Sequence, residues 1–252
     1  MSRTPITAIL LTALLLSACA TNKGKEDELG SAEQLYLAGK KDLDAGYYDS
    51  AIEQFESLEA RYPFGNFAQQ AQLDMAYAYY KSDKPESAIS AADRFIKTFP
   101  RHPHVDYAYY LRGLADFDLT SSLYSRMLHD DPARRDPRSV QESFQNFATL
   151  LEQFPDSPYA QDAKLRMIFL RNYLARHEIH VARFYMQRGA YVAVINRSKN
   201  VLATYSQSPS VPEALWLMIR AYRKLGLKPQ AQETQQILEL NFPHFQPDGD
   251  DS

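Results

Sequence analysis

Cys19, the only cysteine of the chain, is the residue best suited to covalent chemistry. A single cysteine cannot form a disulfide within the chain, so its thiol must serve another purpose. Cys19 directly follows Leu16-Ser17-Ala18, which closes an apolar stretch that begins at Ile6. With Arg3 near the amino end, residues 1–18 have the charged start, short apolar middle and small-residue end of a secretory signal. The apolar stretch is too short to span a bilayer.

The residues Leu16 to Cys19 resemble the cleavage site of bacterial lipoprotein signals. The resemblance implies cleavage before Cys19 and attachment of acyl chains, palmitate among them, to its sulfur and new amino group. Several acyl chains together give stable anchoring, whereas one alone is marginal. In the families that this signal resembles, Asp after the cysteine retains a lipoprotein in the inner membrane, so Ala20 points to the outer membrane. The alternative is an ordinary signal peptide that ends beside a cysteine by chance.

Charge and composition narrow the class of protein. Removal of the signal removes Arg3 and changes the net charge from -3 to -4, which is not the balance of a nucleic-acid-binding protein. Residues 19–30 are polar and charged after the lipidated cysteine, and we interpret them as a flexible tether that keeps the folded part near the membrane. Glycine is scarce, at 9 residues, which favours helix over sheet.

Histidine offers the next candidate for chemistry. His177 and His180 are three residues apart within a predicted helix, a spacing that could share a metal ion. The sequence contains no HExxH pattern and no evident third ligand, so we interpret the two histidines as part of a solvated helix face. We therefore predict no catalytic residues, no metal and no cofactor.

A repeated sequence pattern predicts the helices of the chain. Five predicted helix ends carry an aromatic residue, in four cases followed by proline: Tyr62-Pro63, Phe99-Pro100, Phe154-Pro155, Tyr205-Ser206 and Phe242-Pro243. A mostly small residue lies twelve positions before each closing residue, and an apolar one five positions before it. This is the second-helix pattern of the tetratricopeptide repeat, a helix-turn-helix unit of 34 residues. The small positions are Ala51, Ala88, Ser143, Val194 and Ala231, and the apolar ones are Leu58, Phe95, Leu150, Val201 and Leu238.

The pattern predicts an all-α tetratricopeptide superhelix of about five helix pairs, which is about ten helices. Residues 159–188 contain neither glycine nor proline, so repeat four should begin with one long helix. Repeat three carries an insertion at 118–138, which is either a bland solvated segment or a binding loop. The folded region is 31–243, and we expect residues 244–252 to form a disordered tail. The repeats are assigned to about 32–63, 69–100, 104–155, 159–206 and 212–243.

Stacked helix pairs expose an extended concave face lined by the first helix of each pair. In the first two repeats the repeat register predicts a groove with aromatic walls and two lysines, suited to an extended peptide that carries aromatic groups and a carboxylate. For Tyr77 and Tyr80, packing between helices is the open alternative. The predicted groove residues are Tyr36, Lys40, Leu43, Leu73, Tyr77, Tyr80 and Lys81.

Longer segments carry a resemblance to a known family. They include Arg61-Tyr62-Pro63-Phe64-Gly65, Arg135-Asp136-Pro137 in the insertion, and residues 188–197. With the lipoprotein signal and the five repeats, these segments resemble the BamD family, the lipoprotein subunits of the β-barrel assembly machinery of diderm bacteria. The resemblance covers residues 19–242.

The resemblance implies a non-enzymatic scaffold on the periplasmic face of the outer membrane. Its C-terminal repeats would bind the last POTRA domain of BamA, the barrel subunit. It would also bind other Bam lipoproteins, and its N-terminal repeats would receive unfolded outer-membrane protein clients. Arg197 matches the family position that contacts an acidic group on the POTRA domain. Arg188, Tyr191 and Asn196 of the same segment are assigned to that contact.

Two other functions are compatible with a repeat lipoprotein. One is a scaffold that organises peptidoglycan enzymes, which would co-purify with cell-wall hydrolases or synthases and without a barrel subunit. The other is an enzyme on a helical scaffold, which would need several titratable groups converging in one pocket. No such set is evident in the sequence.

Overall fold

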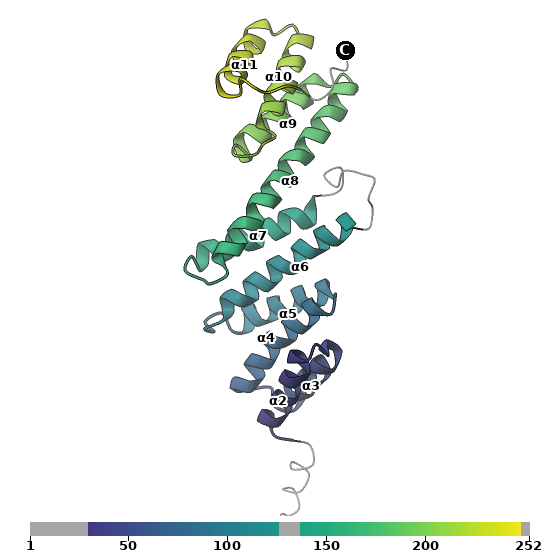
Figure 1. The fold of residues 1–252 in the computed structure, drawn as a ribbon, viewed down its shortest axis with the longest axis vertical. Helices are drawn as coiled ribbons and strands as arrows, with labels where there is room; N and C mark the ends of the chain where they lie inside the picture. Colours follow the sequence, from purple (N-terminus) through teal and green to yellow (C-terminus); the bar gives the residue numbers. More distant parts are fainter. Residues whose placement is uncertain (1–29, 126–136, 248–252) are drawn as a thin grey trace, which may run out of the picture. The chain divides into compact units, whose positions relative to one another are not determined.

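The computed structural model describes residues 30–125 and 137–247, and within these ranges the chain forms ten α-helices and no strand (Figure 1). The predicted all-α class and helix number are confirmed. Cys19 and nearly all of the tether lie outside the described residues. The helices are α2 (Ala32–Asp44), α3 (Tyr48–Arg61), α4 (Asn66–Lys81), α5 (Pro85–Thr98), α6 (Val105–Ser125), α7 (Arg138–Gln153), α8 (Ala160–Gln187), α9 (Tyr191–Thr204), α10 (Val211–Lys224) and α11 (Lys228–Asn241).

The chain divides into two compact units, residues 1–84 and 85–252. In the described part of the first unit, α3 packs against both α2 and α4, and α2 also meets α4. In the second unit each helix from α5 to α11 packs against its neighbour in the chain, and α10 also meets α8. The boundary between the units falls inside the segment assigned to the second repeat.

The second helix of each predicted repeat ends in the same way. The aromatic residue after the helix donates its backbone N–H to the carbonyl of the apolar residue four positions earlier, at 2.8–2.9 Å. Proline then follows in four of the five cases, and it cannot continue the helix because it lacks an N–H. The five bonds run from Tyr62 to Leu58, Phe99 to Phe95, Phe154 to Leu150, Tyr205 to Val201 and Phe242 to Leu238.

Two glycines allow the paired helices to approach closely. A Cβ atom on Gly39 of α2 would lie 2.6 Å from the ring of Phe55 on α3. A Cβ atom on Gly113 of α6 would lie 2.6 Å from the ring of Phe147 on α7. Both phenylalanines are fully buried, so neither ring has room to give way. One packing solution therefore recurs in both units.

The predicted long helix of repeat four is confirmed. α8 has 28 residues and ends at Gln187, just before Gly189. Gly189 has a φ of +72°, in the left-handed region that favours glycine. The absence of glycine and proline from the helix itself explains its length.

The predicted insertion starts as a helix rather than as a loop. α6 continues as far as Ser125, so residues 118–125 extend the first helix of repeat three. These residues contain neither glycine nor proline to end it. The remainder, 126–136, lies outside the described residues, and α7 begins at Arg138.

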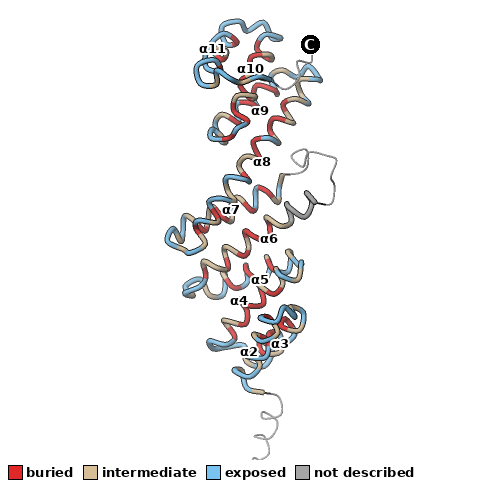
Figure 2. The backbone as a smooth tube through the Cα atoms, in the orientation of Figure 1, coloured by how far each residue is buried: buried red, intermediate tan, exposed pale blue. Residues whose placement is uncertain are grey.

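Buried residues recur on the packed sides of the helices (Figure 2). Phe55 and Leu58 are at the centre of the first unit's core, whereas Val194, Leu217 and Ile219 lie in the core formed by α8 to α11. Among the described residues, no helix combines the length and the apolar character needed to cross a membrane.

Candidate functional site

In the region of the predicted groove, a hydrogen bond joins α2 to α4, which are the first helices of the first and second predicted repeats. The Tyr36 hydroxyl on α2 donates to the Asp74 carboxylate on α4 at 3.0 Å, and Gln70 donates to the other oxygen at 3.2 Å. Asp74 is only 8% exposed. Burial raises the pKa of Asp74 above its usual range, although both hydrogen bonds favour the ionised form. Burial, together with the Asp74 charge, also raises the pKa of Tyr36.

The ring of Tyr36 is fixed as firmly as its hydroxyl. Its centroid lies 6.1 Å from that of Phe55 and 5.5 Å from that of Phe67. Tilted aromatic pairs at these distances are favourable contacts. Tyr36 therefore joins α2 to α4 and presents only part of its ring to a ligand.

Two of the predicted groove residues do not line a groove. Leu43 is 5% exposed and Leu73 is 2% exposed, so both belong to the interior of the first unit. Burying a leucine side chain contributes about 2 kcal/mol, which draws an aliphatic residue at the border of a helix face into the core. The repeat register alone could not separate these two positions from their polar neighbours.

The other predicted groove positions keep some exposed surface. Tyr77 packs partly against the core of the first unit, which favours the packing alternative for this residue. Tyr80 is half-buried and Lys81 is exposed. Lys40 forms an ion pair with Asp44 at 3.1 Å, in which the two side chains are 40% and 65% exposed. A groove that offers lysine and tyrosine to a peptide remains a prediction.

One residue of this unit was missed by the repeat register. Phe64 lies in the turn between α3 and α4 and is 90% exposed, the largest value among the exposed apolar side chains described. Gly65, with a φ of +103°, follows it and begins the turn into α4. A large aromatic residue between proline and glycine is a recognisable signal, because such turns usually carry polar side chains.

In the second unit the predicted docking residue Arg197 is already held by a partner within the chain. Its Nη1 lies 3.2 and 3.3 Å from the two carboxylate oxygens of Glu178 on α8. The Arg197 side chain is 44% exposed, whereas that of Glu178 is 11% exposed. Burial and the Glu178 charge raise the pKa of nearby Tyr205. Glu178 therefore holds the Nη1 end of the guanidinium, while part of the Arg197 side chain remains exposed.

The other predicted docking residues differ in how they are held. Arg188 is exposed, and its guanidinium lies over the Phe184 ring at 4.5 Å. Tyr191 begins α9 and packs against the core of α8 to α11. Asn196 is exposed. The structure thus leaves Arg188, Asn196 and part of Arg197 available to a partner, whereas Tyr191 is mainly structural.

A second tyrosine–aspartate contact, between α6 and α8, was not foreseen. The Tyr110 hydroxyl donates to Asp162 at 2.7 Å, and Nε of Arg166 donates to the same oxygen at 2.5 Å. Tyr110 also stacks on Tyr159, with 4.7 Å between ring centroids. These hydrogen bonds and the Arg166 charge lower the pKa of Asp162 in spite of its burial, while burial and Asp162 raise that of Tyr110 to about 12.

Asp116 on α6 is another buried carboxylate, 4% exposed. Burial, with a further contribution from Glu142, raises its pKa to about 6, although Asn146 donates a hydrogen bond to it. This group therefore gains a proton at mildly acidic pH.

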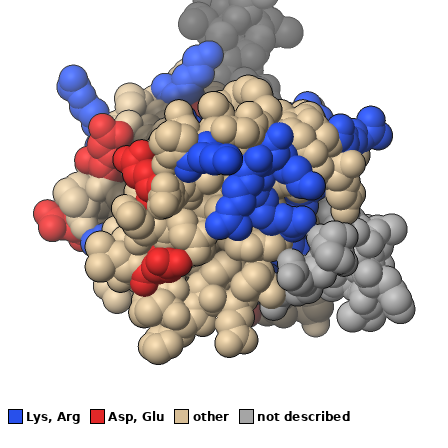
Figure 3. Space-filling view, turned by 90° about the horizontal axis from the view of Figure 1, so that it is seen from above, with Lys and Arg blue, Asp and Glu red and all other residues tan. Residues whose placement is uncertain are grey.

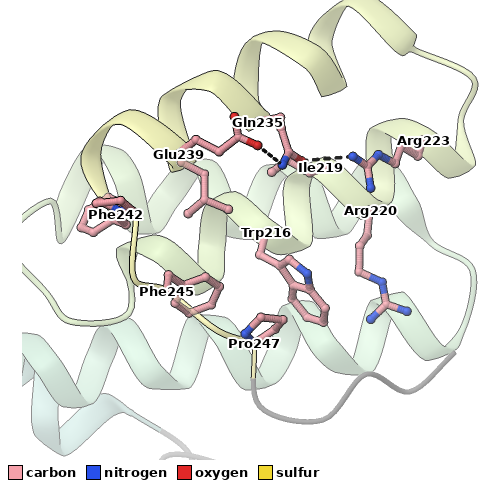
Figure 4. A pocket seen from close by; sticks show the side chains of 11 residues that line it. Trp216, Ile219, Arg220, Arg223, Gln235, Glu239, Phe242, Phe245 and Pro247 are labelled. Atoms are coloured by element: carbon pink, nitrogen blue, oxygen red, sulfur yellow. Dashed lines mark hydrogen bonds between the residues drawn. The ribbon is translucent and has the colours of Figure 1, made fainter.

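A pocket of about 420 Å³ lies between α10, α11 and the segment that follows α11 (Figure 4). The rings of Trp216, Phe245 and Pro247 gather at its centre, and the guanidinium of Arg220 lies 4.7 Å from the Trp216 ring. Seen from the end where α10 and α11 lie, lysine and arginine side chains gather in one patch (Figure 3). The pocket is lined by Trp216, Ile219, Arg220, Arg223, Gln235, Leu238, Glu239, Phe242, Pro243, Phe245 and Pro247.

The described residues contain no group of three or more histidine, cysteine or acidic side chains placed to hold a metal ion. His177 and His180 both lie half-buried on α8.

Comparisons with known proteins agree with one another. Residues 29–237 match the YfiO family, described as "Outer membrane lipoprotein". A Neisseria meningitidis protein named "Outer membrane protein assembly factor BamD" is 42% identical to the chain, over 93% of this chain and 91% of its own length. The protein of the same name from Vibrio cholerae is 35% identical, over 92% and 96%.

Among solved structures, the "TPR2AB-domain:pHSP90-complex of yeast Sti1" matches with a TM-score of 0.46 at 14% identity. The match covers 85% of this chain and 78% of that one. The repeat assignment rests on the helix ends and the helix packing described above.

Proposed function

The chain belongs to the YfiO family of outer membrane lipoproteins, and from this premise we propose that it is a non-enzymatic scaffold of outer-membrane β-barrel assembly. The observation that carries the proposal is the 42% identity to a protein named as an outer membrane assembly factor, which extends over nearly the full length of both chains. Helix pairs with exposed polar faces are suited to such a role, because repeat proteins bind partners over extended surfaces.

The proposed anchor is Cys19, acylated on the periplasmic face of the outer membrane. A short tether would hold the helices close to the membrane. Confinement of this kind raises the effective concentration of a scaffold near membrane-bound partners. The proposed partners are the last POTRA domain of a BamA-like barrel protein, other Bam lipoproteins and unfolded outer-membrane clients.

The proposed docking surface for the POTRA domain comprises Arg197, Arg188 and Asn196. Arg197 is suited to it because Glu178 orients the guanidinium and 44% of the side chain remains exposed. A planar guanidinium with free donors binds a second carboxylate with defined geometry. Client segments would contact Lys40, Lys81 and the part-exposed tyrosines of the first unit.

The ion pair with Glu178 decides how this docking surface should be tested. Charge reversal at Arg197 would place two carboxylates together, one of them nearly buried, and would disturb the fold itself. We therefore compare Arg197→Gln with the double variant Arg197→Gln/Glu178→Gln, which removes both charges. If Arg197 contacts an acidic partner group, both variants lose about 2–5 kcal/mol of binding.

The measurement is co-purification of the tagged lipoprotein from membranes in mild detergent, with quantitative mass spectrometry of its partners. A stoichiometric POTRA-bearing barrel protein is expected with the native chain and is reduced in both variants. Recovery in the double variant alone would assign the loss to an unpaired Glu178 and remove Arg197 from the interface. Cell-wall enzymes in place of the barrel protein would overturn the proposed function.

A further inference from the structure

The exposed Phe64 lies at one end of the first unit, in the turn between α3 and α4. Because the side chain is 90% exposed, other residues cover little of its ring. The turn itself is held at both ends. The Tyr62 N–H donates to the Leu58 carbonyl at 2.8 Å, and the Gln69 N–H donates to the Gly65 carbonyl at 3.2 Å. The first unit therefore presents a large apolar side chain on a turn with fixed ends.

The chain enters the first unit at the same end. α2 begins after Gly30, where Ser31 and Gln34 form a capping box that fixes the first turn of the helix. The Tyr62 hydroxyl donates to the Gly30 carbonyl at 3.2 Å. Phe64 follows two residues after Tyr62, so their Cα atoms are no more than about 8 Å apart. The point at which the preceding segment joins the fold is thus tied to the turn that carries the exposed ring.

The proposed anchor brings a membrane to this end of the unit. Eleven positions separate Cys19 from Gly30. Their distance is therefore at most about 40 Å, and a flexible chain of this length averages about half of that. Confinement on this scale raises the effective concentration of the lipid surface around the groups nearest to Gly30. Phe64 is the most exposed apolar side chain among them.

The chemistry of Phe64 suits a lipid surface. Aromatic side chains are favoured at the boundary between headgroups and acyl chains, and a second contact strengthens the attachment that a lipid anchor begins. Phe67, the other aromatic residue close to this turn, is only 37% exposed, and its ring packs against Tyr36 at 5.5 Å. Phe67 thus helps to hold the fold, whereas Phe64 is left outside it.

We propose that Phe64 inserts into the headgroup region of the membrane that holds the anchor, and so turns the α3–α4 end of the first unit towards the lipid. This inference rests on the proposed acylation of Cys19. Tyr47 precedes α3 and lies at its other end. Since α3 has 14 residues and is about 21 Å long, Tyr47 would face away from the membrane.

A tryptophan reporter tests the contact. Trp216 is the only tryptophan of the chain, so Trp216→Phe provides a background without indole fluorescence. Phe64→Trp is introduced into the full chain in this background. The acylated protein is placed in vesicles of phosphatidylethanolamine and phosphatidylglycerol whose acyl chains carry bromine, which quenches indole on contact. We expect about a twofold or greater loss of fluorescence relative to vesicles without bromine, because interfacial groups lie about 5–10 Å into the headgroup boundary.

The matched control is Tyr47→Trp in the same background. Tyr47 is 67% exposed, belongs to the same unit and shares the same anchor. Its quenching therefore measures the proximity to lipid that anchoring alone produces, and we expect little of it. Both substitutions replace an exposed aromatic residue with another, and circular dichroism checks that the helix content is unchanged.

Equal quenching at the two positions, or no quenching at position 64, would overturn the membrane contact in an acylated chain while leaving the anchor intact. Mass spectrometry of the N-terminal peptide measures the acylation separately. A Cys19 without acyl chains would overturn the anchor of the proposed function and this contact with it. The two failures are therefore distinguishable, and neither readout requires a barrel partner.

Discussion

In each unit a tyrosine–aspartate hydrogen bond joins two helices, Tyr36–Asp74 in the first unit and Tyr110–Asp162 in the second. The two contacts differ in the charges around the carboxylate. Each joins the first helices of two repeats through a tyrosine hydroxyl and a carboxylate. In the second unit Arg166, four residues after Asp162, neutralises the carboxylate. In the first unit the residue four positions after Asp74 is Ala78, and a neutral amide from Gln70 takes the place of the cation.

The pKa values of the two carboxylates are shifted in opposite directions from the ordinary value of aspartate. Asp74 is almost fully buried, and the hydrogen bonds and the Lys40 charge offset this only in part, so desolvation dominates and its pKa is raised. Asp162 has Arg166 beside it, and its pKa is lowered. The burial of each carboxylate and the cation beside it together set the direction of its pKa shift.

The largest expected loss of stability comes from the glycine–phenylalanine contact that both units contain. Gly39→Ala and Gly113→Ala each place a methyl group against a fully buried phenylalanine ring. We expect each to lower the free energy of unfolding by about 3 kcal/mol, after a gain of about 1 kcal/mol in helix propensity. Urea denaturation of the full chain, followed by circular dichroism, measures the loss.

A clearly smaller loss for one glycine would show that its unit is less tightly packed than the other. Gly46→Ala is the control, because a Cβ atom there meets nothing within 4 Å. Its φ of +82° makes that substitution unfavourable through the backbone alone.

We expect the hydroxyl groups of Tyr36 and Tyr110 to contribute unequally to the free energy of unfolding. Tyr36→Phe leaves a nearly buried Asp74 with one remaining donor, at a cost of about 2 kcal/mol. Tyr110→Phe should cost about 1 kcal/mol, because Arg166 still satisfies Asp162. Amide hydrogen exchange of α2 and α4 against α6 and α8 locates each loss. Equal costs would mean that the charge of Arg166 does not compensate.

The cation itself should contribute less than the hydroxyl of Tyr36. Arg166→Gln removes an i,i+4 ion pair whose side chains are 27% and 45% exposed, for which we expect about 0.5 kcal/mol. The complementary substitution Ala78→Arg would not reproduce the pair, because Ala78 is fully buried. A loss above that of Tyr36→Phe in the same denaturation experiment would reverse the order of the comparison.

The stability of the chain also changes with pH, and the contributions of Asp74 and Asp162 have opposite signs. Asp74 binds a proton more readily in the folded state, so its ionisation costs stability, which returns as the pH falls through its raised pKa towards the ordinary value. Asp162 contributes stability that is lost as the pH falls from its ordinary value through its lowered pKa. Asp116 behaves like Asp74, with a pKa of about 6.

Carboxyl chemical shifts, followed by NMR as the pH is varied, separate these three groups. Asp74→Asn should abolish the gain of stability on acidification in α2 and α4 while leaving Asp162 unchanged. A lowered pKa for Asp74 in this titration would contradict the role of desolvation in the first unit.

Much of the fold was predictable because its determinants are local in the chain. An aromatic residue and proline end a helix wherever they occur, and a stretch without glycine or proline extends one. These rules predicted five helix ends and the length of α8. Residues 118–125 also lack glycine and proline, and α6 extends through them.

The candidate sites depended on residues far apart in sequence. Asp74 lies 38 residues from Tyr36, and Glu178 lies 19 residues from Arg197. Repeat register placed Tyr36 and Leu43 on one face without indicating which would be buried. The sequence by itself determined the helices, their ends and the family, because backbone geometry responds to near neighbours. Only the tertiary structure decided which side chains are buried, neutralised or left free to bind, because burial and electrostatic energy depend on contacts between helices.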